Sequence, residues 1–333
     1  MEKTKDISEF TVIYSLPNSY DFYVHSADGG EDVFEITDFN GVQHELMGTS
    51  NLADIDSISS LELHFKTPLE STSLETYTDG FLQAYSKLNT GELEKIILSR
   101  IYSIPFETKR ILDYLTYLKA SNTTTFVYLV SSPEIGTWIG ATPEKLAEGT
   151  GQNFKTMALA GTRPFSKESA IEWSKKEIAE HEIVVNRIEN VLKKIDSEFL
   201  KKDRTNQKSG QVVHLKTEFE FRTNSISEFI SLLHPSPAIS GQPKDQALEA
   251  IKKIEQHNRS LYTGYLGFEK DGRSHYYVNL RCMQIFKNSA SLYLGGGITK
   301  DSVLENEWLE TEHKAKSLLQ PLEKMQKFAE NDF

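Results

Sequence analysis

Acidic side chains close to the C-terminal end share one face of an expected helix. Glu307, Glu310 and Lys314 stand at positions i, i+3 and i+7, which places them on the same side of an α-helix. Two carboxylates about one turn apart can bind a hard cation through their oxygen atoms. The same spacing is typical of a solvated face with a Glu310–Lys314 ion pair, and spacing alone favours this simpler interpretation.

A lysine and a Glu-His pair are further candidates. Lys95 comes directly before the apolar run 96–98, where a lysine is usually solvated or blocks the pairing of an edge strand. In a cleft, a neutral lysine amine could instead act as a general base. Glu180 and His181 fall within an expected helix, where such a pair most often lies at the surface or is a satisfied polar pair, and by itself it says little about a metal.

Three short segments combine polar groups with glycine or proline. Gly295, Gly296 and Gly297 follow a strand-like run, and glycine lets backbone N–H groups approach an anion closely. A tight bend between strands explains these glycines equally well, because the pattern is not that of a phosphate-binding loop. The segments 160–164 (AGTRP) and 234–237 (HPSP) carry a hydroxyl, a cation and an imidazole, and plain turns would also account for them.

The elements that must position these residues do not follow a regular alternation of strand and helix. Hydrophobic periodicity predicts strands at 11–16, 22–24, 95–100, 125–130 and 138–140, and helices at 74–89, 111–119, 167–200 and 304–319. Residues 201–211 are polar and predict a surface loop, whereas 276–278 and 292–294 resemble the two strands of a hairpin. This order disfavours a doubly wound parallel sheet and predicts a mixed α+β fold with mainly antiparallel sheets.

Composition limits the class of protein. The 333 residues are 38% hydrophobic and 26% charged, with no apolar run long enough to span a membrane. A net charge of −11 argues against nucleic acid as the main partner, and an anionic substrate would need local cations. Cys282 is the single cysteine, so neither an internal disulfide nor a cysteine-based zinc site is expected. The first residues lack the apolar stretch of a secretory signal, so we expect a cytoplasmic protein.

Taken together and in order, these segments resemble the chorismate-utilising enzymes. The matching segments are EKIILSR at 94–100, GATPEKL at 140–146, ALAGTRP at 158–164, KEIAEHEIVV at 176–185, LLHPSPAISGQP at 232–243, SLYTGYLGF at 260–268, NLRCMQI at 279–285, LYLGGGIT at 292–299 and ENEWLETEHKAK at 305–316. The resemblance implies one domain in which two stacked, mainly antiparallel sheets are flanked by helices. Residues 76–320 would be its catalytic part, and 1–75 would be a short, divergent N-terminal part.

The resemblance also implies a substrate and a metal. Members of this family act on chorismate, an anionic cyclohexadiene, and use Mg²⁺. The family's magnesium ligands correspond to Glu180, Glu307 and Glu310. This match reverses the interpretation of the C-terminal acidic face, which would now contribute metal ligands. The ion would neutralise the ring carboxylate of the substrate.

Three positions distinguish the branches of the family. Anthranilate-type members usually carry glutamine at the position of Lys95, and aminodeoxychorismate-type members use a nucleophilic lysine at the position of Ala160. Salicylate synthases tend to have threonine at the position of Ala238. The resemblance therefore points to isochorismate synthase. A salicylate synthase, which adds pyruvate elimination, and an aminating subunit remain alternatives, as does a non-catalytic binding protein that has kept the fold.

The resemblance assigns roles to individual residues. Lys95, neutral when it acts, would take a proton from a water that attacks C2 of the ring, and Glu144, protonated when it acts, would donate a proton to the departing C4 hydroxyl. The expected substrate-binding residues are Thr162, His234, Ala238, Tyr262, Arg281, Gly295, Gly296, Gly297 and Lys314. We expect a monomer without a glutaminase subunit. The sequence leaves open whether the product feeds menaquinone, a catechol siderophore or salicylate.

Overall fold

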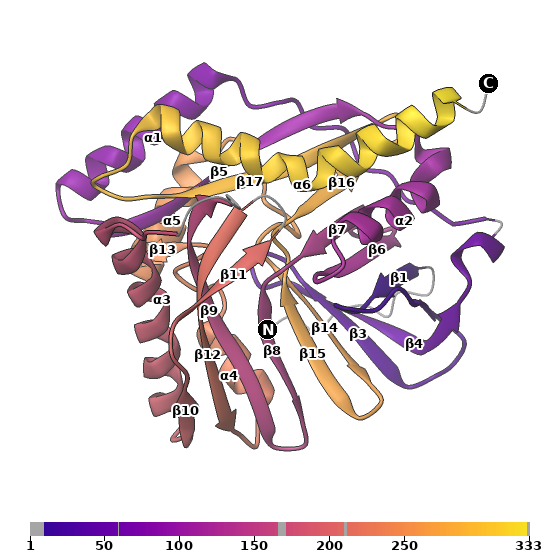
Figure 1. The fold of residues 1–333 in the computed structure, drawn as a ribbon, viewed down its shortest axis with the longest axis horizontal. Coiled ribbons are helices and arrows are strands. Elements are labelled where there is room, and N and C mark those ends of the chain that lie inside the picture. Colours follow the sequence, from indigo (N-terminus) through magenta and orange to yellow (C-terminus); the bar gives the residue numbers. More distant parts are fainter. Residues whose placement is uncertain (1–9, 59, 166–170, 210–211, 332–333) are drawn as a thin grey trace.

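Two antiparallel β-sheets face each other in the computed structural model, which describes residues 10–58, 60–165, 171–209 and 212–331 (Figure 1). The first sheet contains, in spatial order, β4 (Gln43–Ala53), β2 (Phe22–Ser26), β1 (Thr11–Ser15), β6 (Phe126–Ser132), β7 (Gly136–Thr142), β16 (Cys282–Ile285), β17 (Ser289–Ile298), β5 (Lys95–Pro105) and β13 (Gly241–Gln242). The second contains β4, β3 (Asp32–Thr37), β14 (Tyr265–Lys270), β15 (Arg273–Val278), β8 (Lys145–Thr150), β9 (Asn153–Pro164) and β12 (Val212–Arg222), with β10 (Phe199–Lys201) and β11 (Thr205–Ser209) on the far edge of β12. The predicted fold class is confirmed.

Strand β4 belongs to both sheets. Its residues 43–48 pair with β3, and its residues 49–53 pair with β2. The change of partner occurs at Gly48, where a Cβ atom would clash with the carbonyl oxygen of Ser26. A glycine therefore lets the two strands approach closely at the point where the chain passes between the sheets.

An aromatic core fills the space between the sheets. Phe126 of the first sheet stacks on Tyr277 of the second, with ring centroids 4.4 Å apart and planes 2° from parallel. Phe34 and Phe268 stack at 5.3 Å, and Tyr14 lies 4.7 Å from Phe268. Because these rings come from strands far apart in sequence, their burial holds the two sheets together.

Helices cover the outer faces of both sheets (Figure 1). The helices are α1 (Leu74–Asn89) and α5 (Lys244–Ile254) on β5, α2 (Ile111–Ser121) and α6 (Leu304–Asn331) on the first sheet, and α3 (Lys175–Lys194) and α4 (Ile226–Leu233) on the second, with 3₁₀ turns at Ile55–Ser57 and Thr108–Arg110. Among the described residues, each helix is too short or too polar to cross a lipid bilayer.

The predicted bounds of the long helix were wrong at both ends. The helix begins at Lys175, because the carboxylate of Glu177 accepts from the backbone N–H of Ser174 in a capping box. It ends at Lys194, and Asp196 takes a left-handed φ of 51° that an α-helix cannot accommodate. Residues 167–170 of the predicted helix lie outside the described part of the chain.

Two other predictions from the polar and apolar pattern were also wrong. Residues 201–211 were predicted as a loop, but β10 and β11 pair with β12, because an edge strand can expose polar side chains on its open side; residues 210–211 lie outside the described part. The predicted hairpin of 276–278 with 292–294 does not form. Strand β15 pairs in the second sheet with β14 and β8, whereas β17 pairs in the first with β16 and β5.

The C-terminal helix is longer than predicted. It runs to Asn331 and includes Pro321, well beyond the expected end at residue 319. Leu318, Leu322 and Met325 are buried against α2 and the first sheet. This packing stabilises the second half of the helix, although a proline removes one backbone hydrogen bond.

Candidate active site

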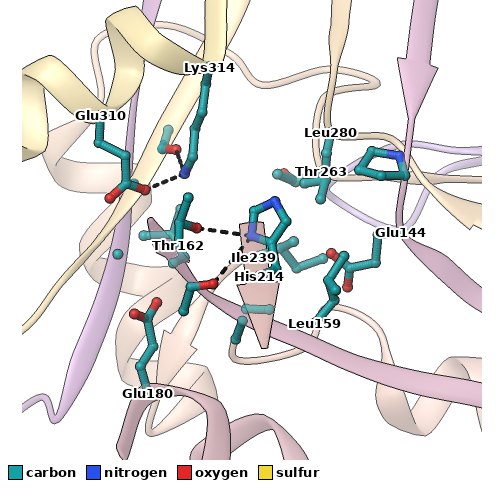
Figure 2. Close-up of a pocket in the computed structure, with 18 of the residues that line it drawn as sticks. Glu144, Leu159, Thr162, Glu180, His214, Ile239, Thr263, Leu280, Glu310 and Lys314 are labelled. Carbon is teal, nitrogen blue, oxygen red and sulfur yellow. Dashed lines mark hydrogen bonds and ion pairs between the residues drawn. The ribbon is translucent and has the colours of Figure 1, made fainter. Parts of the chain in front are cut away.

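A cavity opens where the chain crosses between the two sheets. Most of the predicted site residues line it, namely Lys95, Glu144, Thr162, Glu180, Ala238, Tyr262, Arg281, Gly295, Gly296, Gly297, Glu310 and Lys314. Glu144 lies in the short connection from β7 to β8, and Arg281 in the connection from β15 to β16. Both connections lead from one sheet to the other, so the fold itself places these two side chains at the cavity; Figure 2 shows the position of Glu144.

Two predicted residues lie outside the cavity lining. Glu307 lies in an adjoining groove, which shares Glu180 and Glu310 with the cavity. His234 is buried with its ring 5.1 Å from that of Tyr265, and neither ring nitrogen has a hydrogen-bond partner among the described residues. The expectation that His234 lies at the substrate therefore has no support in its position.

The three glycines form the floor of the cavity rather than a bend or a loop. They lie within β17 and pair with Ser99, Leu98 and Ile97 of β5. A Cβ atom at Gly297 would lie 2.9 Å from both Oε1 of Glu180 and Cε of Lys95. The absence of a side chain therefore leaves room for these two groups directly above the strand.

Each of the three candidate metal ligands is paired with a lysine. The pairs are Lys95 Nζ with Glu180 Oε1 at 2.7 Å, Lys176 Nζ with Glu307 Oε1 at 2.9 Å, and Lys314 Nζ with Glu310 Oε1 at 2.6 Å. In this arrangement, the described part of the chain contains no group of three acidic, histidine or cysteine side chains that is placed to bind a metal ion. A cation would have to replace the lysines.

Glu307 and Glu310 come together above Gly296. A Cβ atom there would lie 3.6 Å from Oε2 of Glu307 and 3.6 Å from Oε1 of Glu310. Burial, and then the charge of Glu310, raise the pKa of Glu307. Burial also opposes ionisation of Glu310, but Lys314 outweighs it and lowers the pKa of that carboxyl. Two neighbouring carboxylates that repel each other, one buried and one partly buried, fit the binding of a divalent cation.

Glu144 lies across the cavity from Glu180 and Glu310 (Figure 2). Its side chain is buried, and burial raises its pKa from 4.5 to about 7, although the charges of Arg281 and Lys95 oppose this rise. A carboxyl group with such a pKa keeps its proton for a substantial part of the time near neutral pH. It can therefore act as a general acid.

Arg281 and Tyr262 present polar groups to the cavity. Within the described part of the chain, the guanidinium of Arg281 donates no hydrogen bond to another protein group. Such a fork can bind a carboxylate with two parallel hydrogen bonds. The Oη of Tyr262 would lie 2.7 Å from a Cβ atom on Gly295, whose carbonyl oxygen accepts from Lys314 Nζ at 2.7 Å.

A histidine that sequence reasoning missed also lines the cavity. His214 on β12 lies opposite Thr162 of β9, and its Nδ1 is 3.1 Å from Thr162 Oγ1 and 3.3 Å from the carbonyl oxygen of Gly161. The sequence around it reads only as a strand, and its place in the cavity depends on the pairing of β12 with β9. Four apolar side chains that the sequence did not single out also line the cavity: Ile97, Leu159, Ile239 and Leu280.

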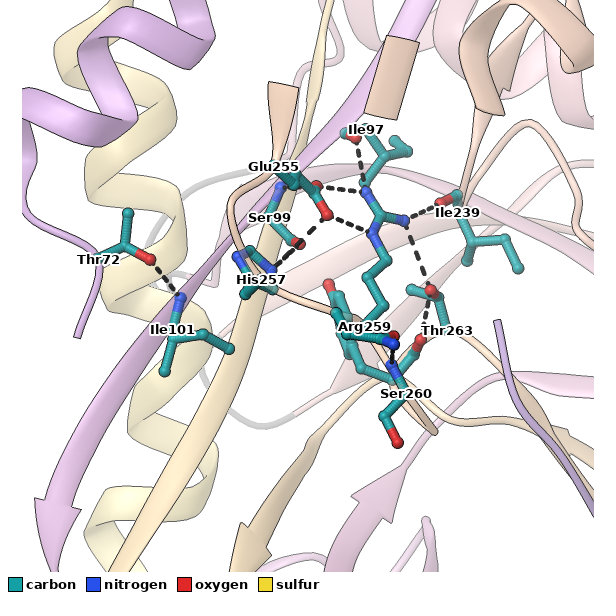
Figure 3. A network of polar contacts seen from close by, with 12 residues as sticks. Thr72, Ile97, Ser99, Ile101, Ile239, Glu255, His257, Arg259, Ser260 and Thr263 are labelled. Carbon is teal, nitrogen blue, oxygen red and sulfur yellow. Dashed lines mark hydrogen bonds and ion pairs between the residues drawn. The ribbon is translucent and has the colours of Figure 1, made fainter. Parts of the chain in front are cut away.

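A buried ion pair supports the cavity wall from behind (Figure 3). Arg259 and Glu255 form two contacts of 2.6 and 2.8 Å, and each side chain is at most 2% exposed. Arg259 also donates to the carbonyl oxygens of Ile97 and Ile239, while Glu255 accepts from the N–H of Ser99. The pair therefore ties β5 to the segment after α4, both of which line the cavity.

Comparison with known proteins agrees with this arrangement. A family model described as chorismate binding enzyme matches residues 37–323. The chain belongs to the chorismate-binding enzyme family. The resemblance expected from the ordered segments is thereby confirmed. The matched region begins in β3, so it includes part of the N-terminal segment for which the sequence offered no clear match.

Two curated relatives and one solved structure illustrate the similarity. The isochorismate synthase EntC of Escherichia coli is 29% identical over 260 residues, which cover 73% of this chain and 66% of EntC, just under two-thirds of its length. Component 1 of the anthranilate synthase of Streptomyces coelicolor is 30% identical over 258 residues, covering 73% of this chain and 50% of that protein. The structure of MenF, the menaquinone-specific isochorismate synthase of Escherichia coli, superposes with a TM-score of 0.81 over 95% of this chain and 89% of MenF, at 20% identity.

Proposed function

We propose that this member of the family is an isochorismate synthase, which converts chorismate to isochorismate. The observation that carries the proposal is the placement of Lys95 and Glu144 in one cavity, with the carboxyl of Glu144 holding a pKa of about 7. An amine that accepts a proton and a carboxyl that donates one are the two groups that water attack and loss of a hydroxyl require.

The proton transfers can be assigned to these two side chains. Lys95, once it has left its ion pair with Glu180 and lost a proton, removes a proton from a water molecule as the water oxygen bonds to C2 of the ring. Both ring double bonds shift by one position, and the C4–O bond breaks. Glu144 gives its proton to the departing hydroxyl, which leaves as water. One water molecule enters and one leaves, so the reaction is an isomerisation overall.

Local cations would bind the anionic substrate in a protein whose net charge is −11. The guanidinium of Arg281, which has no hydrogen-bond partner among the described residues, is suited to a substrate carboxylate, and Lys314 lies beside the same cavity. Tyr262 and Thr162 add hydroxyl groups to the lining. These contacts provide the positive potential that the molecule as a whole lacks.

Glu180, Glu307 and Glu310 would hold a magnesium ion. The repulsion between Glu307 and Glu310 and the lysine on each carboxylate are the observations that support a cation here. When bound, Mg²⁺ would neutralise a substrate carboxylate and help to withdraw electrons from the ring. The lysines Lys95 and Lys176 would then turn to other partners.

Two alternatives to isochorismate synthase are considered, because some relatives have other activities. A salicylate synthase would also eliminate pyruvate, and an aminating subunit would use ammonia in place of water. Ala160 and Ala238 line the cavity, and both lack the lysine or threonine that those branches tend to carry at these positions. We further propose a cytoplasmic monomer that needs no glutaminase subunit.

Product identification tests the proposal. Purified protein is incubated with chorismate and Mg²⁺, without ammonia, and the products are separated by chromatography and identified against standards, because isochorismate has the same mass as chorismate. Isochorismate alone is the expected product. Salicylate with pyruvate would show the salicylate synthase activity, and a product that forms only with added ammonium would show the aminating activity. No turnover in any of these mixtures would refute an enzymatic role on chorismate.

A further inference from the structure

The imidazole of His214 leaves one nitrogen without a partner in the cavity wall. Its Nδ1 lies 3.3 Å from the carbonyl oxygen of Gly161, which can only accept a hydrogen bond. The hydroxyl of Thr162, 3.1 Å from Nδ1, can donate or accept, so the carbonyl decides: we assign the proton to Nδ1, which leaves Nε2 with a lone pair. The side chain is 7% exposed, and Nε2 has no hydrogen-bond partner among the described residues.

The ring stays neutral in this position. Burial, and then the charges of Arg281 and Lys314, lower the pKa of His214 to about 3. Nε2 is therefore an acceptor at any pH at which the protein would work. Figure 2 shows the ring between Thr162 and Glu144, beside the space that a ligand would fill.

The missing partner of this acceptor must be a hydrogen-bond donor. Carboxylates of an anionic ligand are acceptors only and would be repelled by a lone pair, so they belong at Arg281 and Lys314. The donors that the reaction brings into the cavity are the ring hydroxyl of chorismate and the attacking water. Buried polar atoms in proteins are nearly always paired, so the free Nε2 is consistent with a partner that arrives with the ligand.

We propose that His214 is a ligand-binding residue whose Nε2 accepts a hydrogen bond from an O–H group, either the ring hydroxyl of the substrate or the attacking water. This inference rests on the proposed function. It assigns His214 to the recognition of a neutral donor, whereas the cations of the site recognise the carboxylates.

Two substitutions separate this role from a structural one. In His214→Asn, the side-chain amide can keep the contact with Gly161 but lacks an atom at the position of Nε2. In His214→Gln, an amide oxygen can replace Nε2 as the acceptor, while the contact with Gly161 is lost. We expect His214→Asn to lower kcat/KM on the order of tenfold and His214→Gln to stay within about threefold of wild type, at unchanged melting temperature. Wild-type kinetics in His214→Asn, or an equal loss in both variants, would overturn the inference.

A substrate analogue identifies the donor. If the ring hydroxyl is the donor, His214→Asn weakens the binding of chorismate, and 4-deoxychorismate, which lacks that hydroxyl, binds wild type and variant equally. If water is the donor, neither dissociation constant changes and kcat alone falls. If wild type does not turn chorismate over, the proposed function fails separately. The dissociation constants then test the role of His214 by themselves. The inference stands only if His214→Asn binds chorismate more weakly than wild type does and binds 4-deoxychorismate equally well.

Discussion

Lys95 and Glu180 form an ion pair across the cavity floor, with Nζ 2.7 Å from Oε1 and the lysine side chain only 1% exposed. The pair joins the first residue of β5 to the second turn of α3, and the lack of a side chain at Gly297 makes room for it. The proposed general base therefore forms an ion pair with a proposed metal ligand. A cation that takes the carboxylate would release the amine from this partner.

Replacing Lys95 by alanine should abolish isochorismate formation and leave the fold intact. Loss of a general base costs about two to four orders of magnitude in rate. The measurement is the initial rate of product formation at saturating chorismate and Mg²⁺. Lys109→Ala is a suitable control, because the side chain of Lys109 is 81% exposed and far from this chemistry. Turnover of the Lys95 variant near the wild-type rate would contradict the assigned role.

Ionisation of Glu144 should reduce kcat/KM at alkaline pH. The group must be protonated to act, and its pKa of about 7 lies above the ordinary value of 4.5, so kcat/KM should fall as the pH rises above about 7. Glu144→Gln should lose activity. A pH profile of wild type that stays flat up to pH 9 would speak against Glu144 as the acid.

The same substitution should stabilise the folded protein at alkaline pH. Because the folded pKa is raised, ionisation of Glu144 is unfavourable in the folded state; the penalty is absent below pH 4.5 and complete above about pH 7. Glutamine has no such penalty, so Glu144→Gln should raise the free energy of unfolding at pH 8 by up to about 3 kcal/mol. Urea unfolding at pH 5 and pH 8 measures the difference, which should fall to less than about 1 kcal/mol at the lower pH.

Glu310 should control the affinity for magnesium. Glu310→Gln removes one charge from the acidic pair above Gly296, and we expect Mg²⁺ to bind at least about tenfold more weakly. Calorimetric titration with Mg²⁺ measures this affinity directly. The matched control is Glu305→Gln, an exposed glutamate on the same helix that should leave the affinity unchanged. Equal affinities for wild type and Glu310→Gln would remove Glu310 from the metal site.

A methyl group on the cavity floor should disturb the Lys95–Glu180 pair. In Gly297→Ala the new Cβ would lie 2.9 Å from atoms of both residues, so one of them must move. A displacement of about 1 Å can cost on the order of a hundredfold in kcat/KM. Gly296→Ala is the comparison, because its Cβ makes only ordinary contacts at 3.6 Å and should cost less. A larger loss of kcat/KM in Gly296→Ala than in Gly297→Ala would contradict the close packing at Gly297.

Removal of Arg259 should destabilise the protein strongly. Arg259→Leu leaves Glu255 buried without its partner, which typically costs about 3–5 kcal/mol. The double variant Glu255→Leu with Arg259→Leu removes both charges and should recover part of this loss. Chemical denaturation of the three proteins gives the free energies, and a single variant as stable as wild type would show that the pair is dispensable.

The sequence predicted elements well where a local signal marks them. Residues 74–89 form α1 with the predicted bounds, since Ser73 caps the helix and the apolar residues recur at helical spacing. The strands β10 and β11 were missed, because their pairing with β12 is not encoded in their own polar residues. Nor could the sequence place His214, whose position depends on the same strand, or separate Glu307 from the cavity lining.

Strand β4 has a consequence for attempts to shorten this protein. It connects the two sheets, because one part of it pairs in each. Strands β1 and β2 extend the first sheet, and β3 extends the second. A chain trimmed to begin at α1 would lose Tyr14 and Phe34 and expose the stacked rings of Phe126 and Phe268 to water. The residues from α1 onward should therefore not fold as a separate piece, and a shortened version of this protein has to keep its first four strands.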